Sequence, residues 1–277
     1  MYNNIFPHQY HVEWGRRSPK ADDYVIAYNG KEFLVKITDE GPVFLKYGDF
    51  PPESPVKYLF SVDDTAFFVC EGDLFPSGDG IEWRDSNVLR RNQMTKWMAF
   101  AGVTAFHLIK WYRNNRFCGV CGHEMVHSDT ERMVKCPECG NMVYPRISPA
   151  IILAVYDGDR LLMTKYAGRA YANYALIAGF TEIGETLEET ASREAFEETG
   201  IHIKNIRYFK NQPWGFSDSI LVGFYAELDG DPTVTLQENE LSEAKWIPRD
   251  EINVNFEDFS LTNDMVYHFK MNDFDKM

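Results

Sequence analysis

Short apolar runs separated by turn residues make up the first third of the chain. Five of these runs are each long enough for one strand, at residues 24–28, 31–37, 43–47, 58–62 and 66–70. Asn29-Gly30 separates the first two runs and predicts a β-hairpin between them. Residues 1 to about 87 are therefore predicted to form a small β-rich domain.

After these runs, the apolar residues recur at every third or fourth position. Trp97, Ala101, Ala105 and Leu108 follow this spacing and predict a helix over about residues 92–114. Such a stripe favours packing in a core, or against a second subunit, over a ligand site.

The second half of the chain alternates predicted strands with predicted helices, which is typical of an α/β domain. The runs at 150–156 and 160–164 flank Asp157-Gly158-Asp159 and predict a hairpin. Further strands are predicted near residues 176–177, 203–210, 220–227 and 244–247, and helices at 187–199 and 262–271.

The helix predicted at 187–199 has clear ends and an acidic face. Thr186-x-x-Glu189 is a capping box, and Gly200 suits the left-handed residue after a helix. Glu194, Glu197 and Glu198 fall within an arc of roughly 100° on this helix. A solvated acidic surface is the commonest explanation of such a pattern. The alternative is a site for a hard divalent cation such as Mg²⁺, which would offset the repulsion between the carboxylates.

The four cysteines between the two halves form two Cys-x-x-Cys pairs. Cys118 and Cys121 are separated by fourteen residues from Cys136 and Cys139, and a glycine follows each pair. This spacing predicts one structural Zn²⁺ held by four thiolates. Two disulfides are the competing interpretation, which a cytosolic location disfavours. His123 and His127 lie nearby and are read as bystanders.

Composition narrows the classes of function. The chain has 277 residues, 44% of them hydrophobic, and a formal net charge of −14. This charge argues against a non-specific polyanion binder, because phosphate backbones require a basic surface. The first residues lack the apolar core of a signal peptide, and no run of 18 or more apolar residues occurs. A cytoplasmic protein with no membrane partner is expected.

The residues from Gly179 to Ile201 form a longer pattern around the acidic helix. It reads Gly179-x₅-Glu185-x₇-Arg193-Glu194-Ala195-x-Glu197-Glu198-x-Gly200-Ile201. This pattern resembles the signature of the Nudix hydrolases, which cleave nucleoside diphosphates linked to another moiety. Ala195 stands where that family usually has a larger aliphatic residue, so looser packing beneath the helix is expected there.

A second motif narrows the family. Asn211-Gln212-Pro213-Trp214-Gly215-Phe216-Ser217-Asp218-Ser219 resembles the SQPWPFPxS motif of the NudC-type NADH pyrophosphatases, which also carry a four-cysteine ribbon before the Nudix domain. Two aromatic residues two apart on a loop offer flat faces to a base, although most such residues simply fill a core. Glycine and serine replace two of the family's prolines here, which predicts a less pre-organised loop.

The resemblance implies an α+β and α/β multidomain fold. Residues 1–113 would form a β-rich, Nudix-like N-terminal domain with a linking helix. Residues 114–143 would be the zinc ribbon, and residues 144–277 a Nudix α/β/α sandwich.

The resemblance also implies an activity, which is hydrolysis of the pyrophosphate of NADH or NAD⁺ to nicotinamide mononucleotide and AMP by metal-activated water. The implied cofactors are two or three Mg²⁺ or Mn²⁺ ions and one structural Zn²⁺ per chain, and the implied assembly is a homodimer. Removal of the NAD cap from RNA, and a broader hydrolysis of nucleoside diphosphate derivatives, remain alternatives. A Nudix-fold regulator that binds without cutting is disfavoured because the signature glutamates are all present, and a nucleic-acid-binding ribbon is disfavoured by the charge.

The site residues follow from the same resemblance. The catalytic residues and their metal ligands would be Glu194, Glu197 and Glu198, with Glu240 as a further metal ligand. The dinucleotide would be contacted by Arg90, Glu131, Tyr144, Ala178, Phe180, Gln212, Pro213, Trp214, Gly215, Phe216, Ser217, Asp218 and Ser219.

Overall fold

The computed structural model describes residues 3–90, 93–166, 174–236, 241–255 and 259–274. The chain divides into two compact units. The N-terminal unit contains the chain up to Arg146 together with Gly215–Ser217, and the C-terminal unit contains Ile147–Trp214 and the chain from Asp218 onward. The predicted three-part division at residues 113 and 143 stays a prediction.

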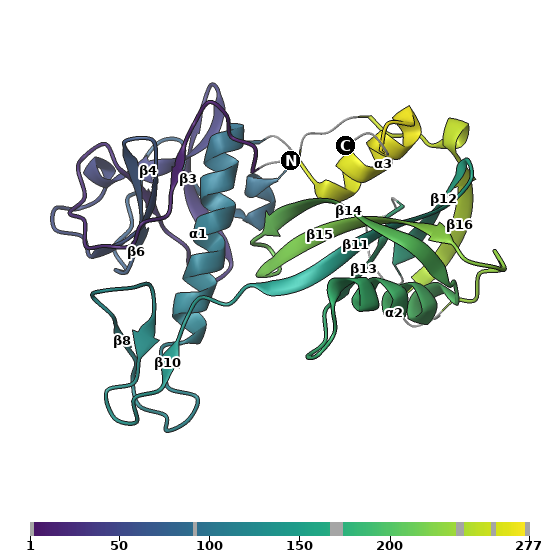
Figure 1. Ribbon diagram of the computed structural model, residues 1–277. Coiled ribbons are helices and arrows are strands. Elements are labelled where there is room, and N and C mark those ends of the chain that lie inside the picture. Colours follow the sequence, from purple (N-terminus) through teal and green to yellow (C-terminus); the bar gives the residue numbers. More distant parts are fainter. Residues whose placement is uncertain (1–2, 91–92, 167–173, 237–240, 256–258, 275–277) are drawn as a thin grey trace. The chain divides into compact units, whose positions relative to one another are not determined.

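The N-terminal unit is built on a seven-stranded sheet in the order β1-β5-β6-β2-β4-β3-β7. Figure 1 labels β3, β4 and β6 of this sheet. The helix α1 (Lys96–Asn114) follows these strands. Two short 3₁₀ helices, Tyr47–Asp49 and Ser86–Leu89, lie between the strands and before α1. The strands are β1 (Tyr10–His11), β2 (Tyr24–Ile26), β3 (Glu32–Thr38), β4 (Gly41–Lys46), β5 (Val56–Val62), β6 (Thr65–Cys70) and β7 (Ile81–Asp85).

The hairpin predicted at Asn29-Gly30 forms, but its paired arms are short. Gly30 has φ +105°, and the Asn29 side chain accepts hydrogen bonds from the backbone amides of Lys31 and Glu32, so the chain does reverse there. Tyr28 and Phe33 form an antiparallel bridge between the two arms, with hydrogen bonds from the Asn29 amide to the Glu32 carbonyl and from the Leu34 amide to the Ala27 carbonyl. Strand β2 instead pairs with β4 and, in parallel, with β6. A local turn signal fixes a chain reversal, but the choice of partner strand depends on side chains far away in the sequence.

The predicted helical stripe before the ribbon packs in a core. Ala101 and Ala105 are fully buried on α1. Gly102 lies so close to the sheet that an added Cβ atom would stand 2.5 Å from Leu89 Cδ2 and 2.8 Å from Phe44 Cζ. The prediction of core packing within the chain is therefore confirmed for this part of the helix.

The ribbon follows α1 as a small three-stranded sheet. Its strands are β8 (Val126–His127), β9 (Val134–Lys135) and β10 (Met142–Val143), in the order β10-β9-β8. Trp111, at the end of α1, packs with Cys118 and Cys136 in one buried cluster, so the ribbon shares a core with the helix.

The C-terminal unit contains one mixed sheet with the order β14-β15-β11-β12-β16, and β13 pairs with β11. Strands β11 and β15 are parallel, and the other pairs are antiparallel. A 3₁₀ helix, Arg249–Glu251, follows β16. The elements are β11 (Ser148–Asp157), β12 (Arg160–Tyr166), β13 (Ile177–Phe180), α2 (Leu187–Thr199), β14 (Ile203–Trp214), β15 (Ser219–Leu228), β16 (Leu241–Pro248) and α3 (Leu261–Met271).

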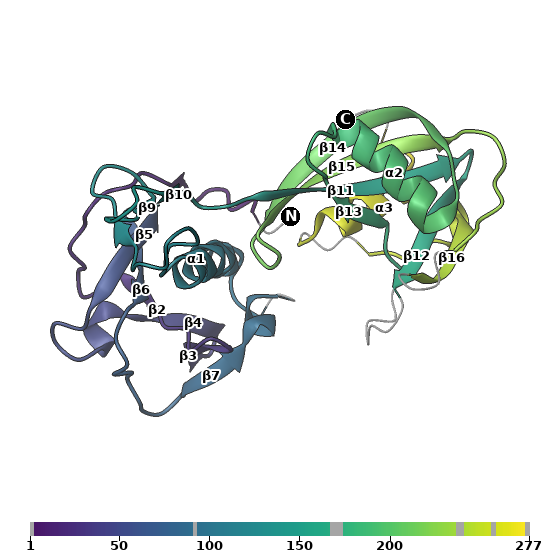
Figure 2. The same ribbon diagram turned by 90° about the horizontal axis from the view of Figure 1, so that it is seen from below.

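The two helices cover opposite faces of this sheet, because successive side chains of a strand point to opposite sides. On β11, Ile151, Leu153 and Val155 join the core beneath α2. Ile152 and Ala154 join the core beneath α3. Figure 2 shows α2 and α3 on either side of β11 and β13. The unit is therefore the α/β/α sandwich that the sequence predicts.

Among the described residues, no helix is long and apolar enough to cross a membrane.

Candidate functional site

Helix α2 begins and ends as its sequence predicts. The Thr186 hydroxyl accepts a hydrogen bond from the Glu189 amide at 3.1 Å, and the Glu189 carboxylate accepts one from the Thr186 amide at 2.8 Å. Gly200 has φ +71°, and its amide donates to the Phe196 carbonyl. Both ends satisfy backbone groups that a helix otherwise leaves without partners.

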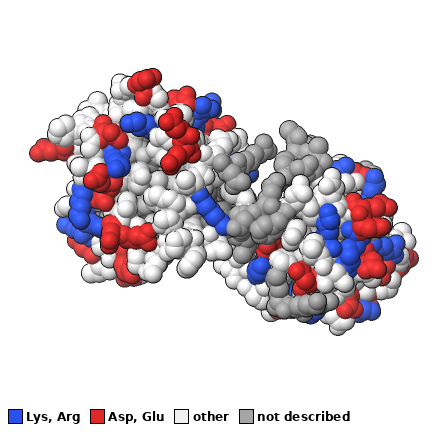
Figure 3. Space-filling view, turned by 90° about the horizontal axis from the view of Figure 1, so that it is seen from above, with Lys and Arg blue, Asp and Glu red and all other residues white. Residues whose placement is uncertain are grey.

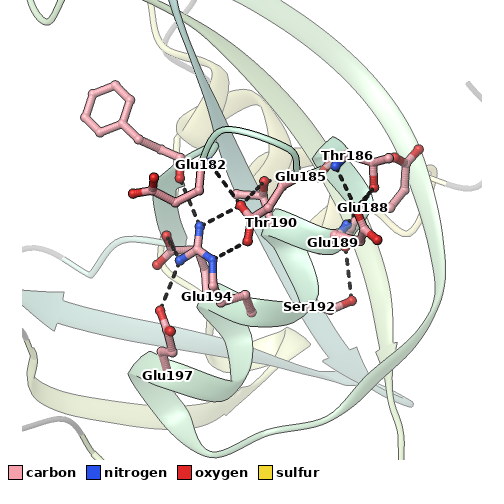
Figure 4. A network of polar contacts seen from close by, with 11 residues as sticks. Glu182, Glu185, Thr186, Glu188, Glu189, Thr190, Ser192, Glu194 and Glu197 are labelled. Carbon is pink, nitrogen blue, oxygen red and sulfur yellow. Dashed lines mark hydrogen bonds and ion pairs between the residues drawn. The ribbon is translucent and has the colours of Figure 1, made fainter.

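The guanidinium of Arg193 lies among the carboxylates on and before this helix, and Figure 4 labels its partners Glu185, Glu194 and Glu197. It donates to Glu185 at 2.6 and 3.0 Å, to Glu194 at 2.7 Å and to Glu197 at 3.0 Å. It also donates to the Phe180 carbonyl at the end of β13, at 3.0 Å. One cation thus joins the loop, the helix and the strand.

The electrostatics of Glu185 follow from this arrangement. Hydrogen bonds from Arg193, from the Glu182 amide and from the Thr190 hydroxyl lower the pKa of Glu185 to about 2. The carboxylates of Glu185, Glu194 and Glu197 in turn raise the pKa of Arg193, and Glu185 contributes most. The pair therefore stays charged over the whole physiological range.

Two of the three predicted catalytic glutamates are largely withdrawn from solvent. The side chain of Glu194 is 12% exposed, whereas that of Glu197 is 52% exposed. Glu198 is only 3% exposed. A solvated acidic surface does not explain Glu194 and Glu198, because burying a carboxylate is costly unless it is compensated.

Glycine at position 179 makes room for one of these carboxylates. A Cβ atom on Gly179 would stand 1.9 Å from Glu194 Cδ and 2.0 Å from its Oε1. Strand β13 and helix α2 therefore approach each other at the point where Glu194 lies. Any larger residue at 179 would displace the carboxylate.

Arg193 is missing from the site residues predicted from the sequence. A divalent cation was the predicted partner of the crowded carboxylates, whereas the Arg193 guanidinium lies between Glu194 and Glu197. The spacing of Arg193 and Glu197, four apart on a helix, is the signal that could have shown this. Four carboxylates (Glu185, Glu194, Glu197 and Glu198) against one guanidinium still leave an excess of negative charge. Carboxylate oxygens are the donors that a hard divalent cation prefers. Among the described residues, however, only the four cysteines of the ribbon have ligand atoms close enough together to hold one ion.

The fourth predicted metal ligand, Glu240, lies outside the described residues.

The predicted substrate contacts fall in both units. Ala178 and Phe180 lie on β13, opposite Ile152 and Ala150 of β11, and Phe180 is 52% exposed. Arg90, Glu131 and Tyr144 belong to the N-terminal unit. Tyr144 is 50% exposed, and desolvation together with the neighbouring Glu131 carboxylate raises its pKa.

The motif after the signature is not the single loop that the sequence predicts. Gln212, Pro213 and Trp214 end strand β14, and Ser219 begins β15 as the partner of Trp214. Strand β14 is at the edge of the sheet, where a proline in a strand is tolerated because its missing amide faces no partner. Asp218 has φ +56° in the turn, and its carbonyl accepts a hydrogen bond from the Ser148 amide.

Gly215–Ser217 pack within the N-terminal unit. The Lys110 ammonium donates to the carbonyls of Gly215 and Phe216, at 2.9 and 3.1 Å. The Arg90 guanidinium stands 3.9 Å from the centre of the Phe216 ring. The two aromatic residues of the motif thus have different neighbours, because the Trp214 ring contacts Phe259 of the C-terminal unit.

The four predicted zinc ligands come together in the ribbon. The sulfur atoms of Cys118, Cys121, Cys136 and Cys139 all lie within 4.8 Å of one another. Three of the pairs are 3.4, 3.4 and 3.6 Å apart. Four thiolates on one tetrahedral zinc ion stand about 3.8 Å apart, so the cluster fits that ion.

The backbone repeats itself around the two cysteine pairs. Gly122 and Gly140 have φ +78° and +75°, and their amides donate to the carbonyls of Cys118 and Cys136. Backbone amides of Val120 and Cys121 lower the pKa of Cys118 to about 6, which favours the thiolate form that binds metal.

The competing interpretations of the ribbon find no support among the described residues. All four thiols are free, so no disulfide joins them. The cluster contains neither His123 nor His127. His127 instead lies 2.8 Å from the Lys57 ammonium and against the Tyr112 ring.

Two family models match parts of the chain. Residues 146–267 match the family model described as NUDIX domain, and residues 113–144 match the one described as NADH pyrophosphatase zinc ribbon domain. A NUDIX hydrolase structure from Nitrosomonas europaea is 24% identical with a TM-score of 0.48, covering 56% of this chain and 90% of that one.

Curated relatives carry the name NAD-capped RNA hydrolase NudC. That of Haemophilus influenzae is 43% identical over 153 residues, which is 54% of this chain and 56% of the relative, so this alignment spans about half of that protein's length. That of Pectobacterium carotovorum subsp. carotovorum is 42% identical over 222 residues, which is 78% of this chain and 84% of the relative. On this identity and coverage, the chain belongs to the NudC-type family of Nudix hydrolases.

Proposed function

We propose that this protein is a NAD(H) diphosphatase, which hydrolyses the pyrophosphate of NADH or NAD⁺ to nicotinamide mononucleotide and AMP. The observation that supports this most is the withdrawal of Glu194 and Glu198 from solvent, with Gly179 of β13 leaving room for the Glu194 carboxylate. Buried carboxylates contribute little to solubility, and their burial is costly unless they have a role in binding or catalysis.

Glu194, Glu197 and Glu198 would hold two or three Mg²⁺ or Mn²⁺ ions, with Glu240 as a further ligand. Such ions, when bound, neutralise a pyrophosphate and lower the pKa of a coordinated water. Arg193 fixes the orientations of Glu194 and Glu197 through its guanidinium. One carboxylate of the cluster takes the proton from water, and carboxylates that share charge titrate as a group.

The dinucleotide would lie against β13. Phe180, half-exposed at the strand end, presents a ring to the nicotinamide or the adenine, and Ala178 leaves space beside it. Tyr144, Glu131 and Arg90 are proposed as further contacts, together with Pro213–Ser219. Gln212 of the same motif is fully buried and is treated separately below. The ribbon cysteines would hold one structural zinc. We place the enzyme in the cytoplasm and expect a homodimer, as the family resemblance implies.

A second candidate is removal of the NAD cap from RNA, favoured by the name of the curated relatives. The same pyrophosphate would be cut. On the face seen in Figure 3, acidic side chains lie among the basic ones on both units, and the described residues form no broad basic field there. With a net charge of −14, this surface favours the free dinucleotide over RNA as the main substrate.

Product analysis tests the proposal. The full chain is incubated with Mg²⁺ or Mn²⁺ and, separately, NADH, NAD⁺, ADP-ribose, a diadenosine polyphosphate or NAD-capped RNA. We expect AMP and the reduced mononucleotide from NADH, at a higher kcat/KM than for ADP-ribose. Equal values for these two would indicate a broader nucleoside diphosphate hydrolase, and no cleavage of any dinucleotide would overturn the proposal.

A further inference from the structure

The side chain of Gln212 bonds to the backbone on both sides of Ser260. Its Nε2 donates to the Phe259 carbonyl at 2.8 Å, and its Oε1 accepts from the Leu261 amide at 2.8 Å. Gln212 is fully buried. The Gln212 side chain thus bonds to the carbonyl before Ser260 and to the amide after it. A neighbouring β-strand would hold this stretch of backbone in the same way.

These two bonds lie at the start of α3. Leu261 is the first residue of the helix, and its amide is one of those that the helix itself cannot satisfy. The Ser260 side chain accepts from Asn263 in the same turn. Leu261 and Met265 then pack onto β15, where a Cβ atom on Gly223 would stand 2.8 Å from Met265 Sδ. Gln212 therefore fixes where α3 begins on the sheet.

Trp214 lies two residues further along β14, on the same face as Gln212, because side chains alternate along a strand. Its ring meets the Phe259 ring edge-on, with the centres 6.0 Å apart. Phe259 thus bonds to Gln212 through its carbonyl and contacts Trp214 through its ring. Phe259 therefore links the Gln212 side chain to the Trp214 ring.

We propose that Gln212 is a positioning residue for substrate binding, which acts through Phe259 to hold the Trp214 ring. This inference rests on the proposed function, in which Trp214 contacts the dinucleotide. It assigns Gln212 an indirect role, where the motif alone suggests a direct contact. Loss of the two hydrogen bonds would loosen the Trp214 ring and leave the carboxylates on α2 in place.

The expected effect is therefore on KM. Contacts with one aromatic ring contribute roughly two- to tenfold in affinity. Gln212→Met keeps the size of the side chain and removes both hydrogen bonds, so we expect KM for NADH to rise about three- to tenfold with kcat within twofold of wild type. Asn253→Leu is the matched control, since it replaces an exposed amide shortly before α3 with an apolar residue of the same size.

The decisive measurement is a double-mutant cycle with Trp214→Ala. If Gln212 acts through Trp214, then Gln212→Met in the Trp214→Ala background raises KM by less than about 1.5-fold. A direct contact of Gln212 with substrate, or a general loss of stability, would raise KM equally in both backgrounds and overturn the inference. A fall in kcat at unchanged KM would overturn it too.

Two further measurements keep the test independent of how well Gln212→Met folds. Amide hydrogen exchange in the peptide that spans 259–265 should quicken in that variant and stay unchanged in Asn253→Leu. Phe259→Leu keeps the carbonyl and removes the ring, and it should raise KM only when Trp214 is present. Wild-type protein that cleaves no dinucleotide overturns the proposed function and this inference with it, whereas active wild type with an additive cycle overturns the inference alone.

Discussion

At the scale of single residues, the glutamates of α2 differ in exposure, and we propose that those withdrawn from solvent bind metal while the exposed Glu188 only carries surface charge. Glu188 is exposed and lies in the first turn of α2, where the helix dipole stabilises a negative charge. Glu194 and Glu198 are withdrawn from solvent two and three turns later. A glutamate-to-glutamine substitution at each of these three positions tests whether their roles differ.

Glu194→Gln and Glu198→Gln should each lower kcat by roughly two orders of magnitude or more, because a neutral amide binds a divalent ion far more weakly than a carboxylate. Far-ultraviolet circular dichroism should show an intact fold. Glu188→Gln serves as the control and should retain wild-type kcat. Wild-type turnover in both site variants would show that this acidic face takes no part in the reaction.

The ion pair of Glu185 and Arg193 predicts a pH dependence of stability. The pKa of Glu185 falls from 4.5 to about 2 in the folded protein. A carboxyl group with a lowered folded pKa contributes stability that is complete above about pH 4.5 and is lost as the pH falls to about 2. The melting temperature of Glu185→Gln should therefore lie below that of wild type at pH 7, and the difference should shrink between pH 4.5 and 2. A difference that stays constant with pH would contradict this.

At the scale of elements, the zinc ribbon depends on ligands that two equivalent turns supply. Cys118→Ser should lower the melting temperature, since zinc binding is coupled to folding in small sites of this kind. Elemental analysis of wild type should find about one zinc per chain. Cys70→Ser is the control, because Cys70 is the fifth cysteine and lies outside the cluster. An unchanged metal content in Cys118→Ser would contradict the four-thiolate site.

Local signals predicted α2 well and the partners of the strands poorly. The cap at Thr186 and the glycine at 200 lie within a few residues of the groups they satisfy, so the sequence shows them directly. The Asn29-Gly30 turn also formed, but β2 pairs with β6, about forty residues away. The sequence alone could not show which strands share a core.

In the site, too, features set by nearby residues were predicted from the sequence, and features set by distant residues were not. The spacing of Glu194, Glu197 and Glu198 placed them on one face of a helix. The burial of Glu194 against Gly179 of β13 could not be predicted from this spacing. Likewise the Gln212 motif reads as a loop, because only the pairing of Trp214 with Ser219 shows that strand β14 continues through Pro213.

At the scale of the whole molecule, a net charge of −14 limits how RNA could bind. Each phosphate that a protein neutralises makes binding weaker at higher salt. With few such contacts, the Kd of Glu194→Gln for NAD-capped RNA should rise by less than about tenfold between 50 and 200 mM salt. Filter binding measures this, with an uncapped RNA of the same sequence as the control. A rise of about a thousandfold would reveal an extended basic surface.

Gly215 stands where the family motif has proline, and this bears on attempts to stabilise the protein by consensus design. Replacement by the residue common among relatives usually stabilises a protein. Here a Cβ atom at 215 would stand 2.4 Å from the Val103 carbonyl oxygen of α1, and Lys110 already holds the carbonyls of Gly215 and Phe216. Gly215→Pro should thus lower the melting temperature, where overpacking typically costs about 1–3 kcal/mol, while Gly15→Ala, which meets nothing within 4 Å, should not. In this chain the consensus proline would be destabilising, because α1 leaves no room for it. The hydrogen bonds from Lys110 already restrict the backbone that proline would restrict in relatives.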